Sequence, residues 1–513
     1  MITILTTISN HNNTMHYRSI ISIILSAALL SCSKLRVPSQ YTESPDYPNI
    51  YPDYTKGITI PINMAPLSFE PTQETERMIA KFSFRDLELI CGDRQAIPDI
   101  SEWEQLKKAA AGNSIKVEVF TDNNGNWVKY KPFDIYVSTD SIDPYISYRL
   151  IPPSYVSYEE LTINQRCLEN FDEEVIYDNR LCSERGKGQC INCHHYQNYN
   201  PKRMQFHARQ NHGGTFISID GKHKKINMKH DSILSAGVYP AWHPSMNIIA
   251  YSTNKTLQSF HTRDINKIEV LDAASDLILY DIDQNKVTTI EKDPHEFETY
   301  PCWTPDGKML YYCSAHFEYA TDTISRTEAL NRYKDIKYNI YRKRFNPNTK
   351  TFSAKELVYD ASSIGKSATL PRISPDGRFL LFTQGEWGCF HIWHRDADLW
   401  IMDLSTLQAK PLSICNSPNV ESYHSWSNNG KWIIFSSRRN DGVYTRLYIA
   451  HIDKNGQASV PFELPQSDPD YHLQLTKSYN IPEFMKGPVS LKPQEIANIL
   501  KTEGETIIFS QHP

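Results

Sequence analysis

The second half of the chain repeats the segment Tyr300-Pro301-Cys302-Trp303-Thr304-Pro305-Asp306-Gly307-Lys308 in four related forms. The other three begin at Tyr239, Leu370 and Tyr423, and an apolar run of strand length follows each copy. A Pro-Asp-Gly turn between apolar runs is typical of a tight connection between antiparallel strands. A small sheet with two apolar faces is not stable alone, so we expect the units to stack side by side in a ring, which is a β-propeller.

The repeats recur every 53 to 70 residues, which exceeds the usual blade length of about 40 to 45 residues, so loops must be inserted. We expect a propeller over 213–513 with six blades. In this interpretation 215–221 is the second half of a blade, and the segment 506–510 closes the ring with it. Two helices are predicted, one with a capping box at Ser325 and Glu328, and one beginning at Lys492-Pro493.

The N-terminal end of the chain has the pattern of an export signal. An eleven-residue apolar run over 20–30 follows Arg18 and ends in Leu29-Leu30-Ser31-Cys32, which is too short for a membrane span. We expect residues 1–31 to be a signal peptide and Cys32 to be lipidated. The alternative is an ordinary secretory signal with a coincidental cysteine. Basic residues rather than acidic ones follow Cys32, which favours the periplasmic face of the outer membrane. Residues 32–56 are rich in proline and without periodicity, so they predict a tether.

Residues 57–155 predict a small β-rich, sandwich-like domain. Strand-like runs alternate with turn signals, and one helix is expected with Ser101 as its N-cap and Glu104 completing a capping box. Nothing in this domain predicts catalysis.

The segment 156–212 is expected to be loop and helix, and it contains Cys190-Ile191-Asn192-Cys193-His194. Cys-x-x-Cys-His is the spacing of c-type haem attachment. The motif therefore predicts one covalent haem c, with thioethers to Cys190 and Cys193 and His194 as the proximal iron ligand. Met204 and His207 are the candidate distal ligands.

Two alternatives remain for the cysteines. They could form a structural metal site with His207 and His212, or a disulfide or free thiols. His394, in a loop between strands of the third repeat, could also face a site in the propeller channel, although a structural role is the simpler interpretation.

The repeats resemble those of TolB-like (WD40-like) propellers, whose hallmark is an aromatic-Ser-Pro-Asp-Gly-Lys turn; the match is specific in the second and third copies and degenerate in the first and fourth. Together with the lipobox-like end and the Cys-x-x-Cys-His segment, they resemble predicted lipoproteins of Bacteroidetes-type bacteria. This resemblance implies a mainly β propeller fold but little about activity. No other stretch is apolar enough to span a membrane, so we expect a lipid to be the only anchor and the partner to be an envelope or redox protein.

The composition and motifs narrow the functions further. A net charge of −5 argues against nucleic acid as a partner. The absence of a Gly-x-Ser-x-Gly elbow argues against a hydrolase. Two functions are expected: electron transfer or redox sensing through the haem, or a non-enzymatic binding or scaffold propeller that recognises a protein or glycan while its cysteines are structural.

Overall fold

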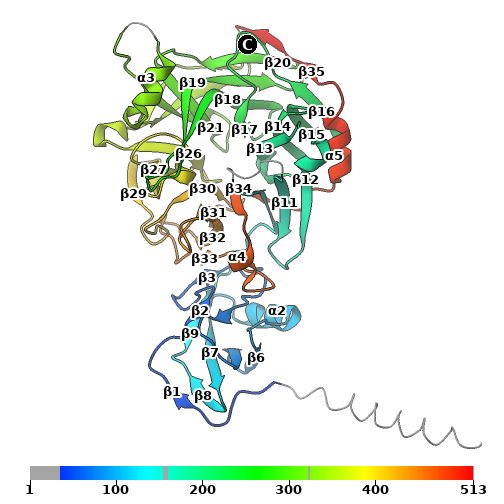
Figure 1. Cartoon of the computed structure of the whole chain (residues 1–513), viewed down its shortest axis with the longest axis vertical. Coiled ribbons are helices and arrows are strands. Elements are labelled where there is room, and N and C mark those ends of the chain that lie inside the picture. Colours follow the sequence, from blue (N-terminus) through cyan, green and yellow to red (C-terminus); the bar gives the residue numbers. More distant parts are fainter. Residues whose placement is uncertain (1–34, 154–159, 322–323, 512–513) are drawn as a thin grey trace, which may run out of the picture.

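The protein is described by a computed structural model that covers residues 35–153, 160–321 and 324–511. A ring of sheets forms one large body, and a smaller β-rich domain projects from its rim (Figure 1). The predicted signal peptide and Cys32 lie outside the described residues. Within these residues, no helix is both long enough and apolar enough to cross a membrane.

The small domain is built on one mixed sheet with the strand order β1-β8-β7-β5-β6, to which β9 and β3 are added beside β7. Its strands are β1 (Thr42–Glu43), β3 (Thr59–Ile60), β5 (Arg77–Phe84), β6 (Leu87–Asp93), β7 (Ser114–Asn123), β8 (Asn126–Lys129) and β9 (Phe133–Val137), and β2 (Ile50–Tyr51) pairs with β4 (Glu70–Pro71) beside them. Helix α2 (Ile100–Ala109) covers the sheet and buries Trp103 against it. The N-cap of α2 is Asp99 rather than the predicted Ser101, because the Asp99 carboxylate accepts from the Ser101 and Glu102 amides at 2.9 and 3.0 Å.

The predicted tether over 32–56 is wrong from Thr42 onward. β1 pairs in parallel with β8, β2 pairs with β4, and Tyr54 is completely buried in the core of the small domain. Two-residue strands cannot show a period in the sequence, so this segment resembled a linker although it is folded.

Among the other residues that the structure describes are six four-stranded antiparallel meanders, which we number as blades (Figure 1). Blade 1 contains β34 (Ser478–Met485), β10 (Tyr145–Ile151), β11 (Thr162–Cys167) and β12 (Glu173–Asp178); blade 2 contains β13 (Gln189–Tyr196), β14 (Arg203–Gln210), β15 (Gly214–Ile219) and β16 (Lys222–Asn227); blade 3 contains β17 (Val238–Trp242), β18 (Ile248–Phe260), β19 (Ile268–Asp281) and β20 (Lys286–Glu291). Blade 4 contains β21 (Glu296–Trp303), β22 (Met309–His316), β23 (Asn339–Asn346) and an outer strand split into β24 (Thr351–Phe352) and β25 (Glu356–Tyr359); blade 5 contains β26 (Ser367–Ile373), β27 (Phe379–Gly385), β28 (Asp398–Asp403) and β29 (Gln408–Pro411); blade 6 contains β30 (Glu421–Trp426), β31 (Trp432–Ser437), β32 (Arg446–His451) and β33 (Phe462–Glu463).

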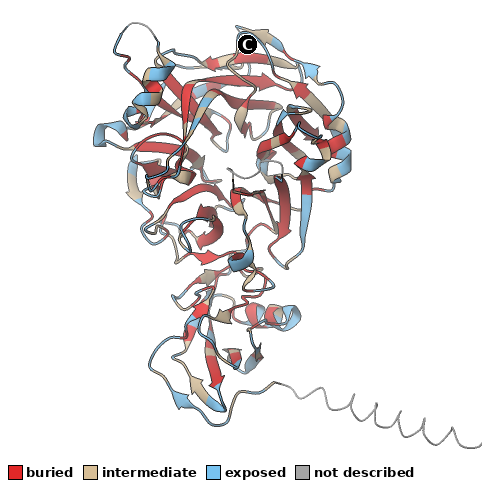
Figure 2. Cartoon of the chain, in the orientation of Figure 1, coloured by how far each residue is buried: buried red, intermediate tan, exposed pale blue. Residues whose placement is uncertain are grey.

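The inner strands β34, β13, β17, β21, β26 and β30 contact one another in cyclic order, so the ring is closed. The mainly β fold and the propeller arrangement are therefore confirmed. Apolar side chains fill the layers between neighbouring blades, and the buried residues follow the strands around the ring (Figure 2). The predicted Pro-Asp-Gly turns join inner and second strands. In blade 4, for example, the Asp306 carboxylate accepts from the Lys308 amide at 3.0 Å, and Gly307 has φ +68°.

The predicted domain boundaries need two corrections. The propeller begins at β10 rather than at 213, so residues 145–151 belong to blade 1 and not to the small domain. The ring is closed by β34, which pairs antiparallel with β10, and not by 506–510. A strand donated from the far end of the chain has no neighbouring repeat in sequence, which is why the turn pattern did not reveal it.

The C-terminal tail binds the outer edges of two blades. After helix α5 (Pro493–Leu500), β35 (Glu505–Thr506) pairs with β16, and β36 (Ile508–Ser510) pairs with β20. The helix predicted at Lys492-Pro493 is confirmed and buries Ile496 and Leu500, and helix α3 (Arg326–Asn331) begins at the predicted cap Ser325. A further short helix, α4 (Tyr471–Gln474), precedes β34.

Candidate functional site

The centre of the propeller is a ring of six β-bulges, one on each inner strand. The bulged residues have φ between +45° and +56°, and their strands shift register against their neighbours at this point. The six residues are Cys193, Tyr239, Tyr300, Leu370, Tyr423 and Ile481. They surround a small void of about 30 Å³, large enough to hold a water molecule. The ring therefore nearly closes the central channel.

The Cys-x-x-Cys-His motif lies on this ring. The predicted loop and helix over 156–212 is instead strand: β13 carries Cys190, Cys193 and His194 and pairs with β14 as the inner strand of blade 2. Cys193 occupies the position of Tyr239 and Tyr300 in the other blades. His194 occupies the position of the proline that follows each of those tyrosines.

The imidazole of His194 is almost fully buried, with 1% of the residue exposed, and neither ring nitrogen has a hydrogen-bond partner. It lies beside the backbone of Ser147 in β10 and Ile481 in β34, and burial lowers its pKa to about 3. His194 is therefore a neutral side chain packed between blades 1 and 2.

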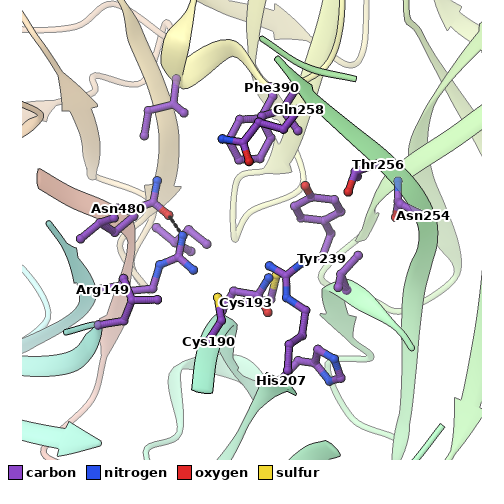
Figure 3. Close-up of a pocket in the computed structure, with 18 of the residues that line it drawn as sticks. Arg149, Cys190, Cys193, His207, Tyr239, Asn254, Thr256, Gln258, Phe390 and Asn480 are labelled. Atoms are coloured by element: carbon purple, nitrogen blue, oxygen red, sulfur yellow. Dashed lines mark hydrogen bonds between the residues drawn. The ribbon is translucent and has the colours of Figure 1, made fainter. Parts of the chain in front are cut away.

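A cavity of about 960 Å³ opens on one side of the bulge ring (Figure 3). Both thiols of the motif line it, together with side chains from five blades. Its lining also includes Arg149, Asn192, His207, Arg209, Tyr239, Asn254, Thr256, Gln258, Phe390, Trp393, Tyr423, Arg438, Tyr444 and Asn480.

The two candidate distal ligands, Met204 and His207, lie in different places in the structure. Met204 is fully buried in the core of blade 2 and does not reach the cavity. His207 lies three residues along the same strand, on the opposite face, and lines the cavity with its Nδ1 3.1 Å from the Thr215 hydroxyl. Burial lowers the pKa of His207 to about 3, so it is neutral. The two side chains lie on opposite faces because β14 is a strand and not part of the predicted loop and helix.

One end of the cavity contains two arginines held in place by polar contacts. Arg149 donates from Nη1 to the Ile191 carbonyl at 2.7 Å and from Nη2 to Asn480 Oδ1 at 3.1 Å, the contact drawn in Figure 3. The Asn192 amide, in the orientation that satisfies its neighbours, accepts from Arg209 Nη2 at 2.5 Å. Neither guanidinium has a carboxylate partner within 4 Å among the residues that the structure describes.

Arg438, directly after β31, is the most unusual cation of the cavity. Only 9% of the residue is exposed, its Nε has no hydrogen-bond partner, and no described carboxylate lies within ion-pair distance. The guanidinium stacks over the Trp393 ring at 4.2 Å. Burial lowers the pKa of Arg438 to about 10, so it is still charged at neutral pH.

The loop of blade 5 that carries Phe390 and Trp393 is fixed to blade 3 by Glu269 in β19. The Glu269 carboxylate accepts from Trp387 Nε1 at 3.0 Å and contacts His394 Nε2 at 3.1 Å. His394 is completely buried and does not line the cavity, so its role is structural.

A covalent haem with the predicted ligand does not fit this arrangement. The cavity supplies the two thiols, but His194 lies behind the bulge ring, away from the cavity. A metal site formed by the cysteines with His207 and His212 is not seen either, because the described ranges contain no group of three or more His, Cys, Asp or Glu side chains placed to hold a metal ion.

Sequence reasoning missed two of the three arginines. Arg149 was assigned to another domain, and Arg438 was not singled out. The only available signal was position: Arg209 and Arg438 lie at the ends of second strands of repeats, where cavity-lining loops begin.

No protein-family model matches the chain, and no curated protein matches it. Several solved structures are similar at a low level. An oligogalacturonate lyase in complex with manganese matches with 11% identity and a TM-score of 0.32, over 62% of this chain and 85% of that chain. A prolyl endopeptidase matches with 10% identity and a TM-score of 0.34, over 62% of this chain and 42% of that chain. Prolyl oligopeptidase B from Galerina marginata matches with 9% identity and a TM-score of 0.34, over 68% of this chain and 42% of that chain. The site assignment rests on the geometry alone.

Proposed function

We propose that this protein is a non-enzymatic binding propeller that takes up an organic anion in the cavity above its bulge ring. One observation carries the proposal: four cations line the cavity and no described carboxylate does, although the chain as a whole has a net charge of −5. The cations are Arg149, Arg209, Lys229 and Arg438.

The unpaired state of Arg438 supports this proposal energetically. Removing a guanidinium from water without a partner costs several kcal/mol, and stacking on Trp393 returns only about 0.5–2 kcal/mol. A carboxylate or similar group of a ligand would complete the site with charge-assisted hydrogen bonds. Folded proteins retain such a cost mainly at functional sites.

The side chains that line the cavity indicate the chemical nature of the rest of the ligand. Aromatic rings of Tyr239, Phe390, Trp393 and Tyr444 line the cavity, and each is only partly buried. Asn192, Asn254 and Asn480 also line the cavity. A mostly apolar wall with a few placed polar groups is typical of a site for an organic ligand rather than for a bare inorganic ion.

The lipobox-like Leu29-Leu30-Ser31-Cys32 supports a location in the cell envelope, with attachment to the membrane by lipid at Cys32. We propose the periplasmic face of the outer membrane.

Calorimetric titration of the purified full-length chain tests the function. Organic carboxylates of graded size are compared with their uncharged amides at two salt concentrations. We expect carboxylates to bind, amides to bind at least tenfold more weakly, and Arg438→Met to remove the difference. Arg344→Met is the matched control, because the Arg344 side chain is 75% exposed and remote from the cavity lining. Equal binding of carboxylates and amides, or no binding of either, would overturn the proposal.

A further inference from the structure

One blade differs from the others at the cavity. The second strand of blade 3, β18, has 13 residues, and its partner β19 has 14, whereas the second strands of the other blades have 6 to 8. The inner strand β17 covers β18 only as far as the pair Val238–Ser252. The hairpin of β18 and β19 therefore extends beyond its own blade, and β18 has no strand partner on the channel side from Thr253 onward in the described structure.

The peptide groups on this free edge can be assigned from hydrogen bonds at its start. The Ile248 carbonyl accepts from His243 next to β17, and the Asn254 amide donates to the Ser235 hydroxyl at 3.0 Å on the same side. Peptide groups alternate in direction along a strand. The amides and carbonyls of Thr256 and Gln258 therefore face the same edge, and neither residue makes a backbone bond there within the described residues.

The residues of this edge line the cavity. Asn254, Thr256 and Gln258 do so (Figure 3), as do Ser235 and Val238 beside the edge. The row continues outward to Phe260, which is 55% exposed at the end of the hairpin. An uncovered strand edge is a template for pairing with another extended chain, and natural proteins usually block such edges.

We infer that the ligand of the cavity is an acidic peptide segment, which adds as a strand to the free edge of β18. Strand addition supplies affinity through main-chain hydrogen bonds, and pockets select alternate side chains. Here the edge at Thr256 and Gln258 would bond the peptide backbone, while Arg438, Arg149 and Arg209 would receive its carboxylates. This inference rests on the proposed function and specifies its ligand.

The test uses the full-length protein and an eight-residue fluorescent peptide with Glu at every second position. Three matched probes accompany it: the same peptide with Gln for Glu, the same peptide N-methylated at alternate backbone nitrogens, and a uronic-acid oligosaccharide with the same number of carboxylates. Binding is followed by anisotropy, and amide hydrogen exchange is measured at Thr256 and Gln258.

We expect the acidic peptide to bind, and N-methylation and the Gln replacement each to weaken binding at least tenfold. Exchange at the two amides should slow at least tenfold on binding. Gln258→Pro should weaken binding at least tenfold more than Gln258→Ala does, because only proline removes the donor from the edge. If proline unfolds the hairpin, the N-methylated probe still decides the question.

Two results would overturn the inference. Equal binding of the N-methylated and unmodified peptides would exclude strand addition. Binding of simple carboxylates or of the oligosaccharide but not of the peptide would also reject it, while leaving the proposed anion site intact. Failure of every anion to bind would instead reject the proposed function.

Discussion

The inner strands of blades 2 and 4 have the same backbone shape at the bulge, but their sequences there belong to unrelated motifs. β13 carries Cys193-His194 at its bulge, and β21 carries Tyr300-Pro301 there, with φ of +56° and +51° at the first residue of each pair. Read locally, one pair belongs to a haem motif and the other to a turn repeat. In the structure they are equivalent positions of one ring. The repeat predicted the structural position of Tyr300, whereas the haem motif did not predict that of Cys193.

The two strands also differ in a buried carboxylate that is present in blade 4 and absent from blade 2. Two residues before the bulge, β13 has Ile191 and β21 has Glu298, both fully buried. Neither oxygen of Glu298 has a hydrogen-bond partner, and burial, followed by the nearby Asp276, raises its pKa to about 9. Blade 6 has Glu421 at this position, but there the carboxylate accepts from the Ser437 hydroxyl at 2.7 Å and from the Ser417 amide at 2.8 Å.

The largest effect is expected for Glu298→Gln. Folding keeps Glu298 protonated up to about pH 9, so the wild type loses stability as pH rises from about 4.5 to 9. Glutamine does not titrate, and the variant should be more stable by about 5 kcal/mol at pH 8, with the difference vanishing near pH 4.5. Denaturant unfolding at several pH values measures this.

Glu421→Gln is the matched control, with the opposite sign. Its amide nitrogen would face donors that the carboxylate now satisfies, which should cost about 1–3 kcal/mol. If both variants changed stability in the same direction, the contrast between the two blades would be refuted.

A smaller gain is expected for Arg438→Met in the absence of ligand. Blade 4 has the buried Ala315 at the equivalent position, so an apolar side chain is compatible with this part of a blade. Removing the unpaired guanidinium should raise stability by about 1 kcal/mol, or about 2 °C in thermal midpoint, while anion binding is lost. A loss of both stability and binding would show that Arg438 is structural. Arg344→Met should change neither quantity.

The repeats made the propeller predictable because each Pro-Asp-Gly turn marks one blade. Blade 1 and the closing strand were not predictable, since β34 and β10 are separated by more than 300 residues and lack that turn. The cavity was predictable only as a location. Cys190, Cys193 and His207 were singled out and do line it, but the direction of each side chain depends on the bulge at Cys193, which shifts register between Asn192 and His195.

Exchanging the bulge residues should have a still smaller effect. If Cys193-His194 fills the place of Tyr-Pro, the double variant Cys193→Tyr/His194→Pro should fold and stay within about 1 kcal/mol of the wild type. The single variant His194→Pro shows the effect of the backbone change at residue 194 without the larger side chain at residue 193. A lack of soluble, folded protein from both variants would show that blade 2 has requirements the other blades do not share.

The last prediction is that the wild type and a variant without the motif cysteines give the same result in a test for covalent haem. The protein is made with its own signal in a host with haem c maturation machinery, beside the variant Cys190→Ser/Cys193→Ser. Because His194 lies behind the bulge ring and not at the cavity, we expect no haem stain after denaturing electrophoresis and no pyridine haemochrome spectrum for either protein. Covalent haem in the wild type that is lost in the variant would mean that β13 rearranges to bring an iron ligand to the cavity. The shared geometry of blades 2 and 4 would then describe only the haem-free protein.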